Sequence, residues 1–452
     1  MISWLAAVAM FARQTPPVQP NVTPVPQPPA ITLPAPPHVE VTTPITAEDA
    51  ARIALLQQPS VLIARAQVLA AQGRTQQARS DLLPNVTLNS SYTRTTNFRG
   101  NASSGSNTGG GSSGGFNSQV SVDQLLFDFN RTVNNVRAAA AREAAARQDL
   151  TATESDVVLA VKDAYYAYQQ DTQLVAVQEA NVASSQAQLT FAQARLTAGL
   201  GPPADVLQAA TNVAAATQAL AQARQTALNS QIALALEMGV DPRTPLALAP
   251  AEEPAPPSDD VNSLVSTALE QRPDIRSAQA TIRAAGYSVS AARAGNLPRV
   301  GLTGSLGSRG PNDPFASNSG SVGISVSWNV FDAGFTAGAV RIARADVEIA
   351  RAQLQQASLA AIRDVSQGWV NLHSAEQRVA IAQAQVANAT ESLRLAEGRF
   401  RAGVSTFLEV TQAQTALTSA QVNLVNAQTL VQFARAQLAH AIGAPVSAPA
   451  GR

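Results

Sequence analysis

Two stretches of this chain lack helix-breaking residues over an unusual length. Residues 128–198 contain neither glycine nor proline, and residues 335–402 contain no proline. At 1.5 Å per residue the first run predicts a helix about 105 Å long, far longer than the helices of ordinary globular domains. Each run leads into a turn with a glycine, Gly199 or Gly403, and then into a shorter run rich in alanine and glutamine. Each half of the chain therefore predicts a long helical hairpin.

The two hairpins are copies of one unit. Gly403 and Gly199 are 204 positions apart (403 − 199), whereas residues 271–274 match residues 57–60 at an offset of 214 (271 − 57). The second copy thus lacks ten residues (214 − 204), which we assign to the Gly/Ser/Asn-rich loop at residues 100–115 of the first copy. Solvent-facing loops tolerate such length changes. The chain is a tandem duplication.

Each copy also contains two strand-like segments before its long helix. The segments span about 84–94 and 119–127, then about 298–307 and 321–331. The last one alternates most clearly, because one face would carry only the apolar side chains Val322, Ile324, Val326, Trp328 and Val330. Strands of about ten residues can cross a bilayer at a tilt. Four strands cannot close a barrel, and an open edge cannot lie in lipid, so several chains must share one barrel.

The predicted organisation follows from these elements. Residues 1–12 have the length and small-residue content of a signal-peptide core, and residues 13–45 are a proline-rich extended segment. A capping-box pattern at 46–49 opens the first repeat. The first repeat spans 46–239 and contains a long helix at 128–198, a tip at 199–205 and a return helix at 206–238. A linker at 240–259 leads to the second repeat, 260–442, which contains a long helix at 332–402, a tip at 403–408 and a return helix at 409–442. A C-terminal tail spans 443–452.

Composition argues against several classes of function. The 31 basic and 31 acidic residues cancel, so nucleic acid is not an expected partner. No cysteine is present, and the three histidines lack metal-ligand spacing, so neither a disulfide framework nor a metal site is expected. No phosphate loop follows a strand and no nucleophile–base signature occurs, so we expect no cofactor and no enzyme. The aromatic residues Tyr165, Tyr166 and Tyr168 are expected to pack opposite Trp369 of the other copy.

The doubled layout resembles the TolC-like outer membrane efflux proteins, also called outer membrane factors, over residues 46–442. The resemblance rests on the duplication, the four strands and the two glycine-containing tips, since no short motif here is specific by itself. It implies an α+β membrane protein and a homotrimer. In that trimer, four strands per chain form a shared 12-stranded outer-membrane β-barrel, and the duplicated hairpins form a periplasmic α-barrel.

The resemblance also assigns roles to the tips. The residues that would face a periplasmic adaptor protein are Arg195, Ala198, Gly199, Leu200, Arg399, Ala402, Gly403 and Val404. The residues that would form a periplasmic gate are Asp205, Glu409 and Gln412. Two departures weaken the likeness: Phe400 stands where the best-known member has a tyrosine, and Gln412 stands where it has an acid. The tip glycines could equally be simple helix caps, and the two acids could equally be solvated residues favoured by a helix N-terminus.

These expectations define a passive exit duct that receives substrate from an inner-membrane pump through the adaptor and contacts outer-membrane lipid. Its tips would open by untwisting of the helix pairs. A trimeric coiled-coil stalk or adhesin is the alternative, but a stalk would show sustained heptads and one strand region near a terminus. A soluble helical scaffold with incidental hairpins is a third possibility. The sequence does not separate drug, metal-ion and protein export.

Overall fold

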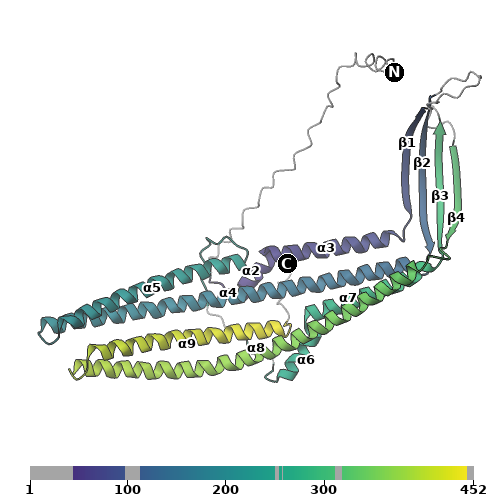
Figure 1. Cartoon of the computed structure of the whole chain (residues 1–452). Helices are drawn as coiled ribbons and strands as arrows, with labels where there is room; N and C mark the ends of the chain where they lie inside the picture. The colour runs from purple at the N-terminus through teal and green to yellow at the C-terminus, as the bar shows by residue number, and fades with distance from the viewer. Residues whose placement is uncertain (1–43, 97–111, 250–253, 257, 311–317, 445–452) are drawn as a thin grey trace, which may run out of the picture. The chain divides into compact units, whose positions relative to one another are not determined.

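Long helices and a four-stranded sheet make up the computed structural model of the chain (Figure 1). The described residues are 44–96, 112–249, 254–256, 258–310 and 318–444. The expected signal peptide at 1–12, the proline-rich segment up to residue 43 and the tail from residue 445 lie outside them. The described residues therefore belong to the two repeats and to the segments that flank and join them.

Both repeats are built from the same elements in the same order. The first repeat contains α2 (Ala47–Gln57), α3 (Pro59–Ser80), β1 (Asn85–Thr96), β2 (Ser112–Phe127), α4 (Arg131–Thr197) and α5 (Pro203–Glu237). The second contains α6 (Val261–Gln271), α7 (Pro273–Arg293), the 3-10 turn η1 (Ala294–Asn296), β3 (Arg299–Gly310), β4 (Asn318–Ser327), α8 (Phe335–Arg401) and α9 (Phe407–Ala441). The long helices α4 and α8 have 67 residues each, and the return helices α5 and α9 have 35 each.

Local chemistry sets where the short helices begin and end. Thr46 and Asp49 form the predicted capping box at the start of α2, with Thr46 Oγ1 accepting from the Asp49 amide at 3.2 Å. Pro59 and Pro273 occupy the first turns of α3 and α7. N–H groups in a first turn have no partner within the helix, so proline costs no helical hydrogen bond there. α2 and α3 meet at an angle of 48°. Among the described residues no single helix is long and apolar enough to cross a membrane, and this bent pair passes by length and composition alone.

The four strands form one antiparallel sheet in the order β1-β2-β3-β4 (Figure 1). β2 pairs with β3, so the sheet joins the two repeats. Two strands differ from the prediction. β2 begins at Ser112 rather than near 119, because its glycines and serines pair with the end of β1, as in Gly115 opposite Thr93. β4 ends at Ser327, and Trp328 and Val330, which were expected within it, lie beyond it.

The register separates the sheet into an apolar and a polar face. Val86, Val122, Gly304 and Val322 are neighbours across the four strands, and one step further Leu88, Val120, Leu306 and Gly320 are neighbours on the same face. The residues between them are small and polar, such as Thr87, Ser121, Ser305 and Ser321. Large side chains on the apolar face are exposed in the single chain, with Val322 at 83% and Leu88 at 70%. This face lacks a covering layer in the part of the chain that the structure describes.

Each long helix packs against its own return helix, α4 on α5 and α8 on α9 (Figure 1). The repeats contact each other through α4, which lies against both α7 and α9. A core at mid-length of α4 collects residues of α2, α5 and the linker, and a second core collects residues of α6, α8 and α9. The duplicated sequence thus gives two similar cores, which α4 connects.

Aromatic packing across the repeats occurs, but with a different partner: Tyr166 meets Phe433 of α9, 6.3 Å between ring centroids, and the expected partner Trp369 is wrong. Tyr165 donates hydrogen bonds to the carbonyls of Ile45 and Ala249, and its ring lies in the first core. Trp369, the equivalent residue of α8 (369 − 165 = 204), donates instead to the Asp259 carbonyl at 2.9 Å and stacks on His373. Both side chains thus donate to backbone carbonyls of irregular segments that flank their own repeats.

Candidate functional site

The two tips have the same backbone geometry. α4 and α8 each end in a glycine with positive φ, +71° at Gly199 and +75° at Gly403. The Leu200 amide donates to the Arg195 carbonyl at 2.8 Å, and the Val404 amide donates to the Arg399 carbonyl at 3.0 Å. At each tip this six-to-one hydrogen bond encloses a five-to-two hydrogen bond from the glycine amide, and the two bonds together define a Schellman motif. The conserved spacing of the duplication therefore reflects one cap built twice.

Glycine is needed at the tips for its φ angle rather than for close packing. A Cβ added at Gly199 or Gly403 would meet no atom of this chain within 4 Å. The matching caps after the return helices behave differently, since a Cβ at Gly239 would lie 3.1 Å from the Gln57 carbonyl and one at Gly443 would lie 3.0 Å from the Arg272 amide. The space beside the tip glycines is open in the single chain.

The predicted tip residues present an exposed apolar end. Leu200 is 70% exposed and Val404 is 67% exposed, and each directly follows the glycine that caps its long helix. Ala198, Gly199, Ala402 and Gly403 are exposed as well. Isolated exposed apolar residues are common, but here two copies of the same short patch project from equivalent caps.

The predicted gate acids lie in the first turns of the return helices. Asp205 is in the first turn of α5 and Glu409 in the first turn of α9, where the helix dipole favours a negative charge. Glu409 Oε2 lies 3.3 Å from Arg399 Nη1, so this acid is paired within its own hairpin. Both acids are half-buried, and Gln412 is exposed one turn beyond Glu409. The structure does not join Asp205 and Glu409 to each other.

Arg195 ties the two hairpins of the chain together. Its Nη1 donates to the Phe400 carbonyl of α8 at 2.7 Å, and its Nη2 donates to the Leu200 carbonyl of its own tip at 3.1 Å. Its Cζ also lies 4.6 Å from the centroid of the Phe400 ring, within the range of a cation–π contact. Sequence reasoning assigned Arg195 to the adaptor face. In this structure its guanidinium is turned to the seam between hairpins.

An apolar cluster lies beneath this contact and includes all four helices of the tips. The ring centroids of Phe400 and Phe407 lie 5.6 Å apart, and those of Phe191 and Phe400 lie 5.8 Å apart. The buried members are Ala192, Ala209, Ala396, Phe400, Phe407, Val410 and Ala413. A phenyl ring at position 400 thus serves as the centre of the cluster, where a tyrosine hydroxyl would have to find a polar partner.

Above the cluster a polar seam joins α4 to α9. Asn181 Oδ1 accepts from Gln414 Nε2 and from Thr418 Oγ1, both at 3.3 Å, and Ser184 Oγ donates to Gln414 Oε1 at 2.8 Å. Gln414 is only 9% exposed. This seam was not among the predictions from the sequence. The sequence pattern that could have indicated the seam is the spacing of its polar side chains on helices that are otherwise rich in alanine. Positions 181 and 184 are three residues apart on α4, and positions 414 and 418 are four residues apart on α9.

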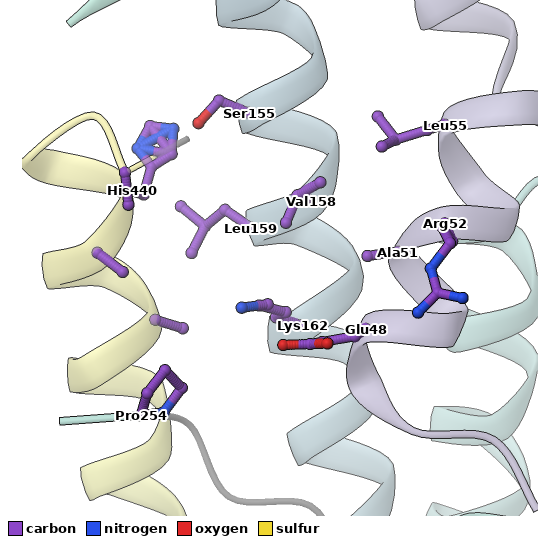
Figure 2. A pocket seen from close by; sticks show the side chains of 13 residues that line it. Glu48, Ala51, Arg52, Leu55, Ser155, Val158, Leu159, Lys162, Pro254 and His440 are labelled. Atoms are coloured by element: carbon purple, nitrogen blue, oxygen red, sulfur yellow. The ribbon is translucent and has the colours of Figure 1, made fainter. Parts of the chain in front are cut away.

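A separate cavity of about 220 Å³ lies where α2, α4 and α9 meet (Figure 2). Glu48, Arg52 and Lys162 bring charged groups to its wall, and His440 brings an imidazole. His440 Nε2 lies 2.8 Å from Asp156 Oδ1. Burial lowers the pKa of His440 below its usual value, with Asp156 opposing that effect. Among the described residues no cluster of three or more His, Cys, Asp or Glu side chains could hold a metal ion.

Comparison with known proteins fits this architecture. The family model described as outer membrane efflux protein matches residues 50–240 and 264–444, one segment for each repeat. The chain belongs to the outer membrane efflux protein family. An outer membrane efflux protein of this kind is located in the outer membrane of a Gram-negative bacterium and acts as a channel of an efflux system.

Proteins similar to this one match most of the chain. BepC of Brucella suis biovar 1, an outer membrane efflux protein, is 30% identical over 327 residues, which are 72% of this chain and 71% of BepC. Protein CyaE of Bordetella pertussis is 30% identical over 383 residues, 82% of this chain and 78% of CyaE. The outer-membrane channel OprN shares the fold, with a TM-score of 0.75 at 23% identity over 88% of this chain and 89% of OprN.

Proposed function

We propose that three copies of this chain close their sheets into one twelve-stranded barrel and their hairpins into one helical tunnel. The observation that carries the proposal is the sheet, whose apolar face is exposed and whose outer strands β1 and β4 each pair on one side only within the described residues. Unpaired strand edges cannot lie in lipid, so the sheet must be completed by other copies. The apolar face then contacts outer-membrane lipid and the polar face contacts water.

In this assembly the duct narrows at its tips. Asp205, Glu409 and Gln412 of three chains form the gate, where like charges and bound cations set the aperture. Two contacts oppose separation of the hairpins of one chain, the Arg195 bridge to Phe400 and the seam centred on Asn181 and Gln414. Opening then consists of untwisting of the helix pairs, which breaks these contacts and widens the ring of acids.

The exposed tip patches are the docking surface for a periplasmic adaptor, which connects the duct to an inner-membrane pump. Support comes from their geometry: positive-φ glycines leave open space beside Gly199 and Gly403, while Leu200 and Val404 project from the caps. Arg195 and Arg399, which flank the two tips, would contact the adaptor only after leaving their present partners. The pump supplies the energy, and the duct is passive.

Reconstitution tests this function directly. Purified protein in detergent is expected to run as a trimer by native mass measurement and to form discrete single-channel currents in a planar bilayer. A trimeric stalk or adhesin would give the same mass but no current, because a solid coiled coil has no water-filled lumen. Monomeric mass together with recovery in the soluble fraction of cells would exclude both the duct and the stalk.

A further inference from the structure

The polar face of the sheet carries an unbalanced positive charge at its loop end. Arg309 lies one residue before the end of β3, opposite Asn117 of β2, and its side chain is exposed. Alternation places it on the same face as Ser305 and Thr303, away from Leu306 and Gly304. Arg309 therefore belongs to the face that contacts water.

The other charges of the sheet do not offset Arg309. Of the strand residues, the charged ones are Arg94, Asp123, Arg299 and Arg309. Asp123 and Arg299 share the polar face with Arg309 but lie at the opposite end, beside the helices, where their signs cancel. Arg94 is at the loop end but on the apolar face, four residues after Ser90 and two after Tyr92. The loop sequences 97–111 and 311–317 add one base, Arg99, and one acid, Asp313.

We propose that Arg309 makes the outer exit of the duct selective for anionic solutes. The inference rests on the proposed function, which turns the polar face toward the lumen and brings three copies of Arg309 into one ring. A ring of guanidinium groups raises the local concentration of anions and lowers that of cations. The ends of the duct then carry opposite charge, with carboxylates of Asp205 and Glu409 at the tips and guanidinium groups at the exit.

The expected effect is modest and depends on salt. Twelve strands spaced about 4.8 Å apart and tilted about 40° enclose a barrel of roughly 12 Å radius. Three unit charges at that distance in water, screened over a Debye length of about 10 Å at 0.1 M salt, change the ratio of anion to cation at the axis by about twofold or more. At 0.01 M salt the screening length rises to about 30 Å and the effect grows accordingly.

Single-channel recording across a potassium chloride gradient tests this inference. Arg309→Gln is expected to lower the chloride-to-potassium permeability ratio by about twofold, and Arg309→Glu to lower it further, since Coulomb energy is linear in charge. Arg309→Lys should keep the wild-type ratio. Because Arg94 lies at the same end on the lipid-facing side, Arg94→Gln is the matched control and should leave the ratio unchanged.

Three results would overturn the inference. If the wild type conducts and Arg309→Glu has the same permeability ratio at low salt, the proposed duct stands and the role of Arg309 is wrong. If Arg94→Gln changes the ratio as much as Arg309→Gln, the two faces have been misassigned. If the wild type carries no current at all, the duct itself fails and the role of Arg309 fails with it.

Discussion

The guanidinium of Arg195 lies over the ring of Phe400, 4.6 Å from Cζ to the ring centroid, while its Nη1 donates to the carbonyl of the same residue at 2.7 Å. One side chain of α4 thus contacts both the ring and the backbone of a single residue of α8. The two residues are 205 positions apart in sequence (400 − 195) and belong to different repeats. This contact joins the two hairpins of a chain at the point where the proposed duct must open.

Removing this bridge should favour the open duct. Arg195→Ala deletes a charged hydrogen bond and a cation–π contact between the hairpins, together worth on the order of 1–2 kcal/mol for a half-buried group. We expect the open-to-closed ratio in planar-bilayer recordings to rise about tenfold, since 1.4 kcal/mol corresponds to a factor of ten. Arg401→Ala is the control, because Arg401 is exposed and pairs with Glu397 one turn away in the same helix, α8. Equal open probabilities in wild type and Arg195→Ala would contradict the bridge.

The gate acids should control cation block. Neutralising both Asp205 and Glu409 by alanine removes six carboxylates from the proposed ring of three chains, so divalent cations on the tip side should bind more weakly. We expect the concentration of divalent cation that blocks the channel to rise by about tenfold or more, because a tenfold change corresponds to a loss of about 1.4 kcal/mol of binding free energy. We also expect the single-channel conductance to change. Glu391→Gln, which alters an exposed acid paired with Arg394 within α8, should change neither. An unchanged conductance and block in the double variant would exclude these residues from the gate.

Replacing the glycine should destabilise the protein more at the cap of a return helix than at the cap of a long helix. Alanine at Gly403 or Gly443 must adopt φ near +75° or +71°, which costs on the order of 1–2 kcal/mol for an L residue. At Gly443 the new Cβ would also lie 3.0 Å from the backbone amide of Arg272, so the neighbouring backbone must give by a few tenths of an ångström. Thermal unfolding of the protein in detergent should show a larger loss for Gly443→Ala than for Gly403→Ala. Equal losses would mean that the close approach at Gly443 relaxes without penalty.

Stability should depend on pH through Asp163. Burial raises the pKa of Asp163 from 3.8 to about 6, and its buried Oδ1 has no hydrogen-bond partner among the described residues. A carboxyl whose pKa is raised by folding stabilises the protein below about pH 4 and loses that contribution as pH rises through 6. The side chain of Asp163→Asn stays neutral at every pH. The free energy of unfolding of this variant should therefore rise relative to that of wild type between pH 4 and pH 7, by on the order of 1 kcal/mol once the partial exposure of the group is allowed for.

Melting temperatures of wild type and Asp163→Asn at pH 4.5 and pH 7.5 measure this difference. Asp149→Asn is the control, because Asp149 is an exposed acid of the same helix. A constant difference between Asp163→Asn and wild type across this range would show that the carboxyl of Asp163 titrates at its ordinary value.

The sequence allowed the long helices and tips to be anticipated because their determinants are local. Runs without glycine or proline predict helices, and α4 and α8 cover nearly the whole of the two runs. The start of α4 was placed three residues early: Asp128 instead accepts from the Thr132 amide at 2.8 Å, and Phe129 and Asn130 adopt positive φ. A side-chain cap that replaces the first turn is hard to recognise without coordinates.

Features that depend on contacts between distant segments were not predictable. The start of β2 follows from pairing with β1 rather than from its own glycine-rich sequence, whose strand propensity is low. The role of Arg195 depends on how two hairpins more than two hundred positions apart are placed. The packing of Tyr165 against the linker, which the sequence suggested would be against the other repeat, depends on the path of irregular backbone. The roles of the tip residues in gating and adaptor binding stay predictions.

The pairing of β2 with β3 has a consequence for biogenesis. β1 with β2 and β3 with β4 are local hairpins, but the residues that β2 pairs with in β3 are between 173 (300 − 127) and 194 (310 − 116) positions away. Pairs of such high contact order close slowly, because the intervening chain loses entropy before any contact is made. Until then each hairpin exposes an edge that another chain can complete equally well. Assembly of the proposed trimer is thus a kinetic competition between intramolecular closure and exchange of repeats between protomers.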